Sequence, residues 1–402
     1  MNIFKVIYAR IYQQTLRLAS NFMSFKEPKI IDGSKDLNKL IDVIKDFKCQ
    51  KPLIVTDESI YKLGLLNRLI TLLEQNNISY AIYHGVVANP TIDNVEEGLK
   101  ILNENKCDFI IGLGGGSSLD CAKIIAARKA NIKKPVNKMK GLLKVGHKPL
   151  KMIAIPTTAG TGSEATVAAV IVDRKNNDKY AINDPKLIPP VAVLDPTLLV
   201  GLPKGVTSTT GMDALTHAVE AFIGQENTKR TKILALEAIK LIFENLEKSV
   251  NDPKNITYRS NMQLASYKAG VAFTRAYVGT VHALAHALGG KYNVAHGLAN
   301  ALLLPLVLKA YGKKAYKKLA IIADYIGVDN SYTIKEKANW FINQIEKMNQ
   351  DMGITNNMKD IIKLEDIPEL VNHAYKEGFP LYPTPKLLTK KELTNNYLGL
   401  IK

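Results

Sequence analysis

Histidine and aspartate side chains at helical spacing are the most chemically informative residues of this chain. Asp213 precedes His217 by four residues, His282 precedes His286 by the same interval, and His296 follows. Residues i and i+4 of a helix lie on one face, so each pair can direct its side chains at one point. Imidazole nitrogens and carboxylate oxygens suit Zn²⁺, Fe²⁺ or a neighbouring first-row ion. The pattern therefore predicts a divalent-metal site.

The spacing leaves open which of His282 and His286 is a metal ligand, because either could reach the ion. The other would lie one helical turn away, where it could relay a proton or only support the site. We expect Gly289 and Gly290 to break the helix so that His296 turns back toward it. Three imidazoles and one carboxylate would leave a site with a net charge near +1, which can polarise a carbonyl or stabilise an alkoxide.

A glycine-rich loop, Gly112 to Ser118, follows an apolar stretch and precedes a helical pattern. Glycines let backbone approach a ligand closely, and the first N–H groups of a helix attract phosphate. The loop lacks the third spaced glycine of the GxGxxG fingerprint, which weakens an ordinary Rossmann interpretation. A second small-residue loop, Pro156 to Glu164, also follows a predicted strand. Together the loops favour a dinucleotide over a mononucleotide, and a tight structural turn is the alternative for the first.

Asp57 directly follows the predicted strand 53–56. Its carboxylate could accept hydrogen bonds from an adenosine ribose, or it could cap the helix that begins at Glu58. With a nicotinamide cofactor beside the metal, an alcohol there would lose its proton more readily and pass a hydride to the nicotinamide. We expect this reaction in a cleft between domains.

Two domains are expected from 402 residues, since one core rarely grows beyond about 300 residues. Strand-like runs at 52–56, 79–83, 108–113, 152–155 and 191–194 alternate with helical patterns, which indicates a parallel sheet covered on both sides. Helical patterns dominate afterwards. We predict an α/β dinucleotide-binding domain over 1–197, with an extension at 1–25, and an all-helical metal-binding and catalytic domain over 198–402.

Composition narrows the class of protein. Three distant cysteines indicate a reducing, cytoplasmic compartment. The formal charge of +17 comes mainly from scattered lysines, so no specific nucleic-acid partner is predicted. No apolar run reaches the roughly 20 residues that span a bilayer. The N-terminal stretch 1–22 is an amphipathic helix by pattern, which we expect to pack on its own protein or a second subunit rather than on a membrane.

Four segments resemble the iron-containing (group III) alcohol dehydrogenases: 114–123, 156–166, 211–221 and 281–305. They stand in family order, and the resemblance covers residues 28–395. It implies the two-domain dehydroquinate synthase-like fold, at least a dimer, and NAD(P)-dependent oxidation of a small alcohol or diol, or reduction of the aldehyde. Four ligands of this type favour Fe²⁺, although Zn²⁺ can occupy such sites.

The resemblance also implies a role for individual residues. It assigns metal ligation to Asp213, His217, His282 and His296, and proton transfer to His286. An acidic Asp57 resembles the members that prefer NAD over NADP, because its carboxylate would repel a 2′-phosphate. The positions that match cofactor contacts of the family are Asp57, Asn89, Gly115, Gly116, Ser117, Thr157, Thr158, Thr161 and Lys179.

Three alternatives remain. Zinc glycerol dehydrogenases and dehydroquinate synthase-like carbon–oxygen lyases share the fold, but their patterns lack a ligand equivalent to His217, and the lyases carry Glu in place of Asp213. An anionic lyase substrate would also need more basic residues than Arg275 and Lys291 around the metal. A nucleotide- or nucleic-acid-binding module without catalysis would leave the metal cluster unexplained.

Overall fold

The computed structural model describes residues 2–176, 178–355 and 357–401. The chain forms two compact units, one of Ser24–Gly201 and one of Met1–Met23 with Leu202–Lys402. The division after Gly201 lies a few residues beyond the expected position, residue 197. Among the described residues, no helix is both long and apolar enough to cross a membrane.

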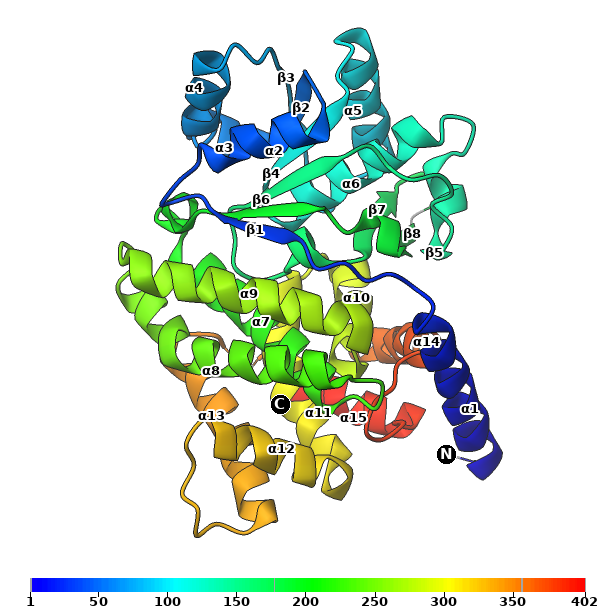
Figure 1. Cartoon of the computed structure of the whole chain (residues 1–402). Coiled ribbons are helices and arrows are strands. Elements are labelled where there is room, and N and C mark those ends of the chain that lie inside the picture. Colours follow the sequence, from blue (N-terminus) through cyan, green and yellow to red (C-terminus); the bar gives the residue numbers. More distant parts are fainter. Residues whose placement is uncertain (1, 177, 356, 402) are drawn as a thin grey trace. The chain divides into compact units, whose positions relative to one another are not determined.

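A six-stranded parallel sheet forms the centre of the first unit (Figure 1), as the alternating pattern predicted. The strand order is β1-β9-β6-β4-β2-β3, and every pairing in it is parallel. The strand bounds are β1 (Lys29–Asp32), β2 (Pro52–Asp57), β3 (Ala81–Val86), β4 (Phe109–Gly114), β6 (Met152–Pro156) and β9 (Val191–Leu194). A smaller sheet, which the sequence analysis did not predict, joins β5 (Gly141–Leu142), β8 (Asp178–Asn183) and β7 (Ala168–Asp173).

Alternate residues of the central strands enter different apolar cores. Leu53 and Val55 join the core that α5 (Ile92–Glu104) and α6 (Gly116–Ala130) cover. Ile54, between them, joins the core beneath α2 (Lys39–Phe47), α3 (Glu58–Lys62) and α4 (Asn67–Gln75). Successive strand side chains point to opposite faces, so a continuous apolar run is what a sheet buried on both sides requires.

The second unit is helical, as predicted. Its helices are α7 (Lys204–Ile223), α8 (Lys229–Asn251), α9 (Ile256–Ala276), α10 (Thr280–Tyr292), α11 (His296–Tyr311), α12 (Lys313–Tyr325), α13 (Ile334–Asp351), α14 (Ile367–Gly378) and α15 (Lys390–Leu400). Local sequence defines several starts: Thr228, Thr333 and Thr389 each cap a helix with a reciprocal side-chain hydrogen bond.

The turn between α10 and α11 differs from the expectation that Gly289 and Gly290 break the helix. Helix α10 continues through both glycines and ends at Tyr292, with Asn293 in the left-handed conformation (φ 54°). The Asn293 N–H donates to the carbonyl of Gly289. Glycine permits a break but does not impose one, whereas Asn tolerates the left-handed backbone that ends a helix.

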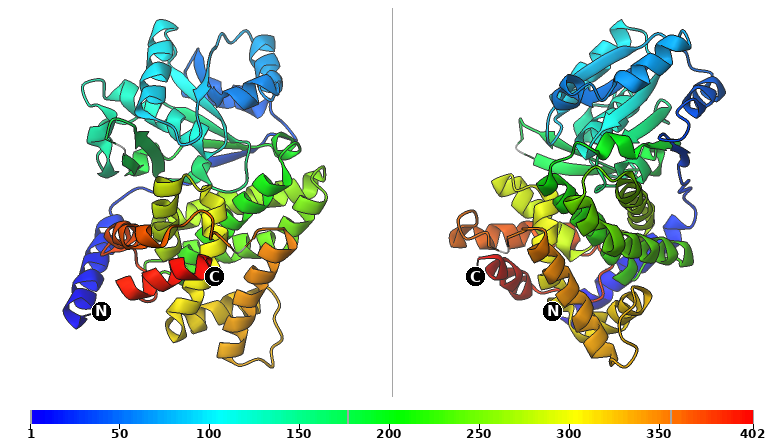
Figure 2. Two further views of the ribbon diagram at one scale, coloured as in Figure 1. Left: turned by 180° about the vertical axis from the view of Figure 1, so that it is seen from behind. Right: turned by 90° about the vertical axis from the view of Figure 1, so that its left-hand side faces the viewer.

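The N-terminal helix α1 (Ile3–Ser20) groups with the helical unit, although the sequence analysis attached residues 1–25 to the α/β domain. In Figure 2 it is the blue helix against the helical unit. Its buried face is small and polar: Ala9, Gln13 and Ser20. Hydrogen bonds from Arg10 and Gln13 to residues 380–384 determine this orientation. The isoleucines of the amphipathic pattern are exposed: Ile3, Ile7 and Ile11.

Candidate metal and cofactor sites

Three helices bring the predicted metal ligands together. Helix α7 carries Asp213 and His217, α10 carries His282, and α11 begins at His296. One ligand atom from each of the four lies within 4.8 Å of all the others. Asp213, His217 and His282 are buried, and His296 is partly exposed. The structure therefore unites the four residues that the family resemblance selected, and it places His286 outside the group.

The distances between these ligand atoms fit a small divalent ion. Asp213 Oδ1 lies 3.4 Å from His296 Nε2, 3.8 Å from His282 Nε2 and 3.9 Å from His217 Nδ1. Two ligands of one tetrahedral ion with bonds near 2.1 Å stand about 3.4 Å apart. The three distances to Asp213 therefore exceed this spacing by at most about 0.5 Å, which suits Zn²⁺ or Fe²⁺.

Asn300, one helical turn after His296 on α11, shows where the ligand atoms converge. Its Nδ2 donates to Asp213 Oδ1 at 2.7 Å and lies 3.2 Å from His282 Nε2 and 3.1 Å from His296 Nε2. Three acceptor atoms thus surround one amide group. Asn300 is fully buried, so this arrangement is held away from bulk water.

Glu220 of α7 orients His282. Its carboxylate accepts hydrogen bonds from Gly279 N (2.7 Å) and Val281 N (2.8 Å), and it lies 2.6 Å from His282 Nδ1. With the proton on Nδ1, the Nε2 lone pair of His282 faces the other ligands. Burial and the neighbouring imidazoles lower the pKa of His282 well below its usual value, which keeps the ring neutral for metal binding.

Glu220 is itself a buried acid. Burial raises its pKa to about 7, although hydrogen bonds from Gly279, Val281 and His282 oppose that shift. A cation at His282 would favour the ionised carboxylate. Glu220 therefore combines two tasks: it caps the start of α10 and holds a predicted ligand of the metal.

His286 lies beside the four ligands and has its own carboxylate partner. Its ring stacks on that of His296 with 5.1 Å between centroids, and its Nδ1 lies 2.6 Å from Glu377 Oε1. The Tyr382 hydroxyl donates to the same oxygen at 2.7 Å. Burial raises the pKa of Glu377, but His286 and the two hydrogen bonds outweigh it, so the pKa lies below its ordinary value.

The two predicted cofactor loops lie side by side in the α/β unit. Strands β4 and β6 are neighbours, with Gly114 opposite Pro156, and Thr157 N donates to Gly114 O. A Cβ at Gly116 would lie 2.8 Å from Thr161 Cγ2, so glycine is what allows the loops to touch. Thr158 lies next to Gly115.

The start of α6 is suited to an anion. Gly115 is its N-cap, no side chain of the described residues caps it, and Ser117 stands in the first turn. Free N–H groups and the helix dipole attract phosphate at such a position. It also lies at the carboxyl end of β4, where the strand order reverses beside β2, the usual ligand position in such sheets.

Asp57 does cap a helix, the alternative that the sequence left open. Its Oδ1 accepts from Ile60 N at 3.0 Å, and its Oδ2 accepts from Ser118 Oγ at 3.3 Å. The second contact places the carboxylate beside the glycine loop, at the end of the adjacent strand. Capping and ribose binding are therefore compatible.

Lys179 and Asn89 form a separate pair. Lys179 Nζ donates to Asn89 Oδ1 at 2.7 Å, and Asn89 has a left-handed backbone (φ 57°). Burial lowers the pKa of Lys179, partly offset by Asp120 on α6.

Three neighbours of the predicted site were missed by sequence reasoning. Glu220 and Asn300 could have been found from the sequence. Glu220 follows His217 by three residues and Asn300 follows His296 by four, so each lies on the helix face that carries the ligand. Glu377 carried none, since it comes from a helix nearly a hundred residues downstream of His286.

Comparisons with known proteins agree with this architecture. A family model described as iron-containing alcohol dehydrogenase matches residues 27–196, and the C-terminal model of the same family matches residues 207–399. Alcohol dehydrogenase 4 of Saccharomyces cerevisiae is 38% identical over 364 residues, which cover 90% of this chain and 94% of that protein.

Solved structures give the same result. The crystal structure of a 1,3-propanediol oxidoreductase superposes with a TM-score of 0.90 and 32% identity, over 94% of this chain and 100% of that chain. A sulfoacetaldehyde reductase from Bifidobacterium kashiwanohense, solved in complex with NAD⁺, superposes with a TM-score of 0.84 and 28% identity, over 94% and 98% of the two chains.

Proposed function

Because this chain belongs to the iron-containing alcohol dehydrogenase family, an oxidoreductase family acting on CH–OH groups, we propose an NAD(H)-linked, Fe²⁺-dependent dehydrogenase of a small alcohol or diol. The reverse reaction reduces the aldehyde. The observation that carries the proposal is the convergence of Asp213, His217, His282 and His296. A buried carboxylate and three imidazoles are a costly arrangement that a divalent ion stabilises.

A divalent ion in this cluster would act as a Lewis acid on the alcohol or carbonyl oxygen, while a nicotinamide ring exchanges the hydride. The protein's own groups do the rest. Glu220 holds His282 with Nε2 toward the other ligands, and Asn300 donates to Asp213. With its Nδ1 held by Glu377, His286 would receive the substrate proton or return it through Nε2.

Cofactor binding is proposed at the adjoining loops of the α/β unit. The start of α6 at Gly115, Gly116 and Ser117 would hold the pyrophosphate, and Thr157, Thr158 and Thr161 would donate to the cofactor from the neighbouring loop. Asp57 would accept from the adenosine ribose and repel a 2′-phosphate, which favours NAD over NADP. Asn89 and Lys179 would complete the site.

The same-fold alternatives have weaker support. The family match spans both units, and Asp213 and His217 form the ligand pair that distinguishes the alcohol dehydrogenase pattern. A dehydroquinate synthase-like lyase or a zinc glycerol dehydrogenase-like enzyme would leave His217 without a ligand role. Release of phosphate from a heptulosonate substrate would support the lyase instead.

The direct test is turnover by protein reconstituted with Fe²⁺ under anaerobic conditions. NAD⁺ with a panel that includes ethanol, 1,2-propanediol and 1,3-propanediol should yield NADH, followed by its absorbance, and the matching aldehydes should consume it. NADP⁺ should be the poorer cofactor. An enzyme that turns over no alcohol or aldehyde with either cofactor would refute the proposal.

A pair of histidine variants separates ligand from proton handler. His217→Ala should lose most of its bound metal, because one of four ligands is gone. His286→Asn should keep its metal, but its kcat should fall by about 100-fold or more. A factor of about 100 is the lower end of what a positioned proton-transfer group contributes. Metal analysis beside steady-state kinetics gives both readouts. Equal metal loss in the two variants would show that the assignment is wrong.

A further inference from the structure

We infer that Glu377 and Tyr382 are positioning residues for His286, and that the N-terminal helix α1 braces them through residues 380–384. This inference rests on the proposed proton-handling role of His286. It also gives α1 a task beyond the packing that its amphipathic pattern predicted. All the residues involved belong to the helical unit.

The contacts nearest to His286 are the hydrogen bonds of Glu377. Its Oε1 faces His286 Nδ1 at 2.6 Å and the Tyr382 hydroxyl at 2.7 Å. A carboxylate at Nδ1 keeps the proton on that nitrogen and leaves Nε2 as the basic atom. Tyr382 occupies a second lone pair of the same oxygen and so restricts the carboxylate to one orientation.

Polar side chains of α1 in turn contact residues 380–384. Gln13, which is 2% exposed, donates through Nε2 to Pro380 O at 2.8 Å and to Tyr382 O at 3.0 Å. Arg10 donates to Thr384 O at 2.9 Å and to Gln13 Oε1 at 2.8 Å. One buried amide thus holds the backbone of the residue whose hydroxyl reaches Glu377.

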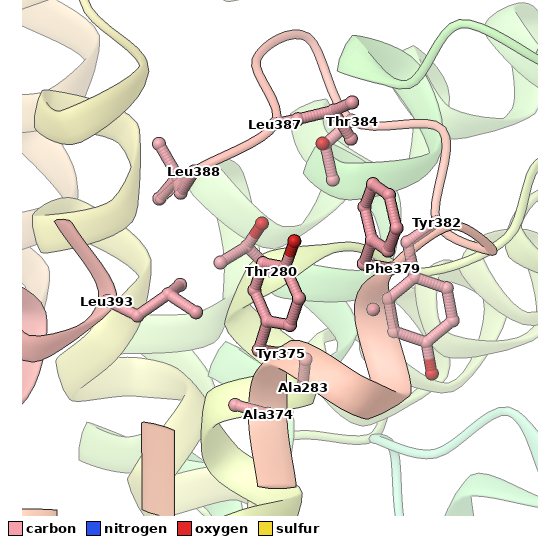
Figure 3. A pocket seen from close by; sticks show the side chains of 11 residues that line it. Thr280, Ala283, Ala374, Tyr375, Phe379, Tyr382, Thr384, Leu387, Leu388 and Leu393 are labelled. Carbon is pink, nitrogen blue, oxygen red and sulfur yellow. The ribbon is translucent and has the colours of Figure 1, made fainter. Parts of the chain in front are cut away.

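Packing alone does not explain the position of this segment. A cavity of about 30 Å³ lies against it, lined in part by Phe379, Tyr382 and Thr384, and Figure 3 shows their side chains around it. Because atoms that line a void lack packing partners there, the hydrogen bonds that Arg10 and Gln13 donate to residues 380–384 contribute more to the placement of this segment.

The contacts of α1 also favour positioning over general stability. Its isoleucines stay exposed, so burial of their apolar surface does not hold the helix. Its Arg10 and Gln13 side chains instead donate to carbonyl groups within residues 380–384, and Arg17 pairs with Glu226. Loss of one such donor should shift Tyr382 without unfolding the unit.

The decisive experiment compares Gln13→Ala with Gln14→Ala, its exposed neighbour on the same helix. Histidines labelled with ¹⁵N in Zn²⁺-loaded protein report the ring tautomers directly, and the chain has only seven. In the wild type and Gln14→Ala, His286 should carry its proton on Nδ1. In Gln13→Ala it should populate both tautomers, as it should in Glu377→Ala.

Kinetics of the Fe²⁺ enzyme supply the second readout. Glu377→Ala should lower kcat by up to about 100-fold, and Gln13→Ala and Tyr382→Phe by smaller factors, with KM and metal content unchanged. The losses in Gln13→Ala and Tyr382→Phe should not multiply in the double variant, because both act through one contact. Unchanged tautomer and kcat in Gln13→Ala, or fully multiplicative losses, would overturn the inference.

The outcomes also distinguish this inference from the proposed function. If the wild type showed no turnover, the proposed function would be refuted. The tautomers of His286 in Gln13→Ala would then still show whether α1 positions that ring. If the wild type turned over normally and Gln13→Ala were unaffected, only the positioning role of α1 would be refuted. Circular dichroism of each variant checks that the helical unit remains folded.

Discussion

At the scale of single residues, the carboxylates behind the histidines are as informative as the histidines themselves. Glu220 and Glu377 each face an Nδ1 atom at 2.6 Å, one on a predicted ligand and one on its neighbour His286. The same contact therefore supports two different tasks. On His282 the Nε2 atom faces the other ligands, and on His286 we propose that it handles the substrate proton.

Glu220→Gln should weaken metal binding by about tenfold to 100-fold, the usual effect of losing an outer partner of a metal-bound histidine. The amide retains the size of the carboxylate but loses its charge, so His282 is held less firmly. Competition with a chelator measures the affinity. Glu226→Gln is the matched control, because Glu226 is also a buried acid of this unit but does not contact a ligand. Equal affinities in the wild type and Glu220→Gln would contradict the role.

Lys123 predicts a pH dependence of stability. Burial lowers its pKa to about 8, although the carboxylates of Asp120 and Glu164 oppose the shift. In the unfolded chain the pKa is near 10.5, so between these values the unfolded state binds more protons. The stability contribution of Lys123 is therefore present above about pH 10 and lost as the pH falls through about 8.

Urea unfolding of the wild type and Lys123→Met should reveal this linkage. The difference in unfolding free energy, wild type minus variant, should rise by at most about 1.4 kcal/mol per pH unit from about pH 8 to about pH 10. Circular dichroism can follow the transition. A difference that stays constant over this range would show that Lys123 titrates normally.

At the scale of elements, close contact between α7 and α11 brings the ligands within reach. Gly297, directly after His296, lies so near α7 that an added Cβ would overlap the backbone carbonyl of Thr209. Thr209 precedes Asp213 by one helical turn. A backbone carbonyl cannot rotate away as a side chain can, so only glycine permits this approach.

Gly297→Ala should therefore separate His296 from Asp213. We expect a loss of about 1–3 kcal/mol in stability, as for other overpacked sites, together with weaker metal binding. Gly290→Ala on α10 is the control, because nothing lies within 4 Å of its added Cβ. That variant should be neutral or gain up to about 1 kcal/mol in helix propensity. Thermal unfolding and metal analysis compare the two.

At the scale of the whole molecule, the two units divide the chemistry. The predicted cofactor residues all belong to the unit of Ser24–Gly201, and the predicted metal ligands all belong to the helical unit. The metal ion should therefore first stabilise the helical unit, and the cofactor should first stabilise the α/β unit. A molecule or ion that binds only the folded form adds to the free energy of unfolding.

Metal removal tests this division. At a metal concentration of about 100 times Kd, the helical unit should gain about 2.7 kcal/mol. Trp340, the only tryptophan, lies on α13 of that unit and reports its unfolding by fluorescence. Zn²⁺ should raise the midpoint in the wild type but not in His217→Ala. NAD⁺ should instead slow hydrogen exchange around residues 112–118. A Zn²⁺ effect that survives in His217→Ala would place the stabilising ion elsewhere.

Much of the fold could be predicted because its signals are local. Continuous apolar runs at β2 and β4 indicated strands buried on both faces, and i, i+4 spacing indicated the ligand pairs. The small sheet of β5, β7 and β8 and the whole of strand β1 were missed, since short, half-buried strands have weak patterns. The inward face of α1 was also beyond the sequence, because polar contacts rather than its apolar stripe determine it.

The sequence by itself determined the types of chemical group available: four histidines, an aspartate and two small-residue loops at spacings that helices and strand ends convert into convergent groups. Only the tertiary structure decided how they are grouped. It unites His282 with Asp213, His217 and His296, and assigns His286 to Glu377, although both histidines share one helix at the same spacing. The reason is physical: spacing defines which residues share a face, whereas the partner across that face comes from a distant segment of the chain.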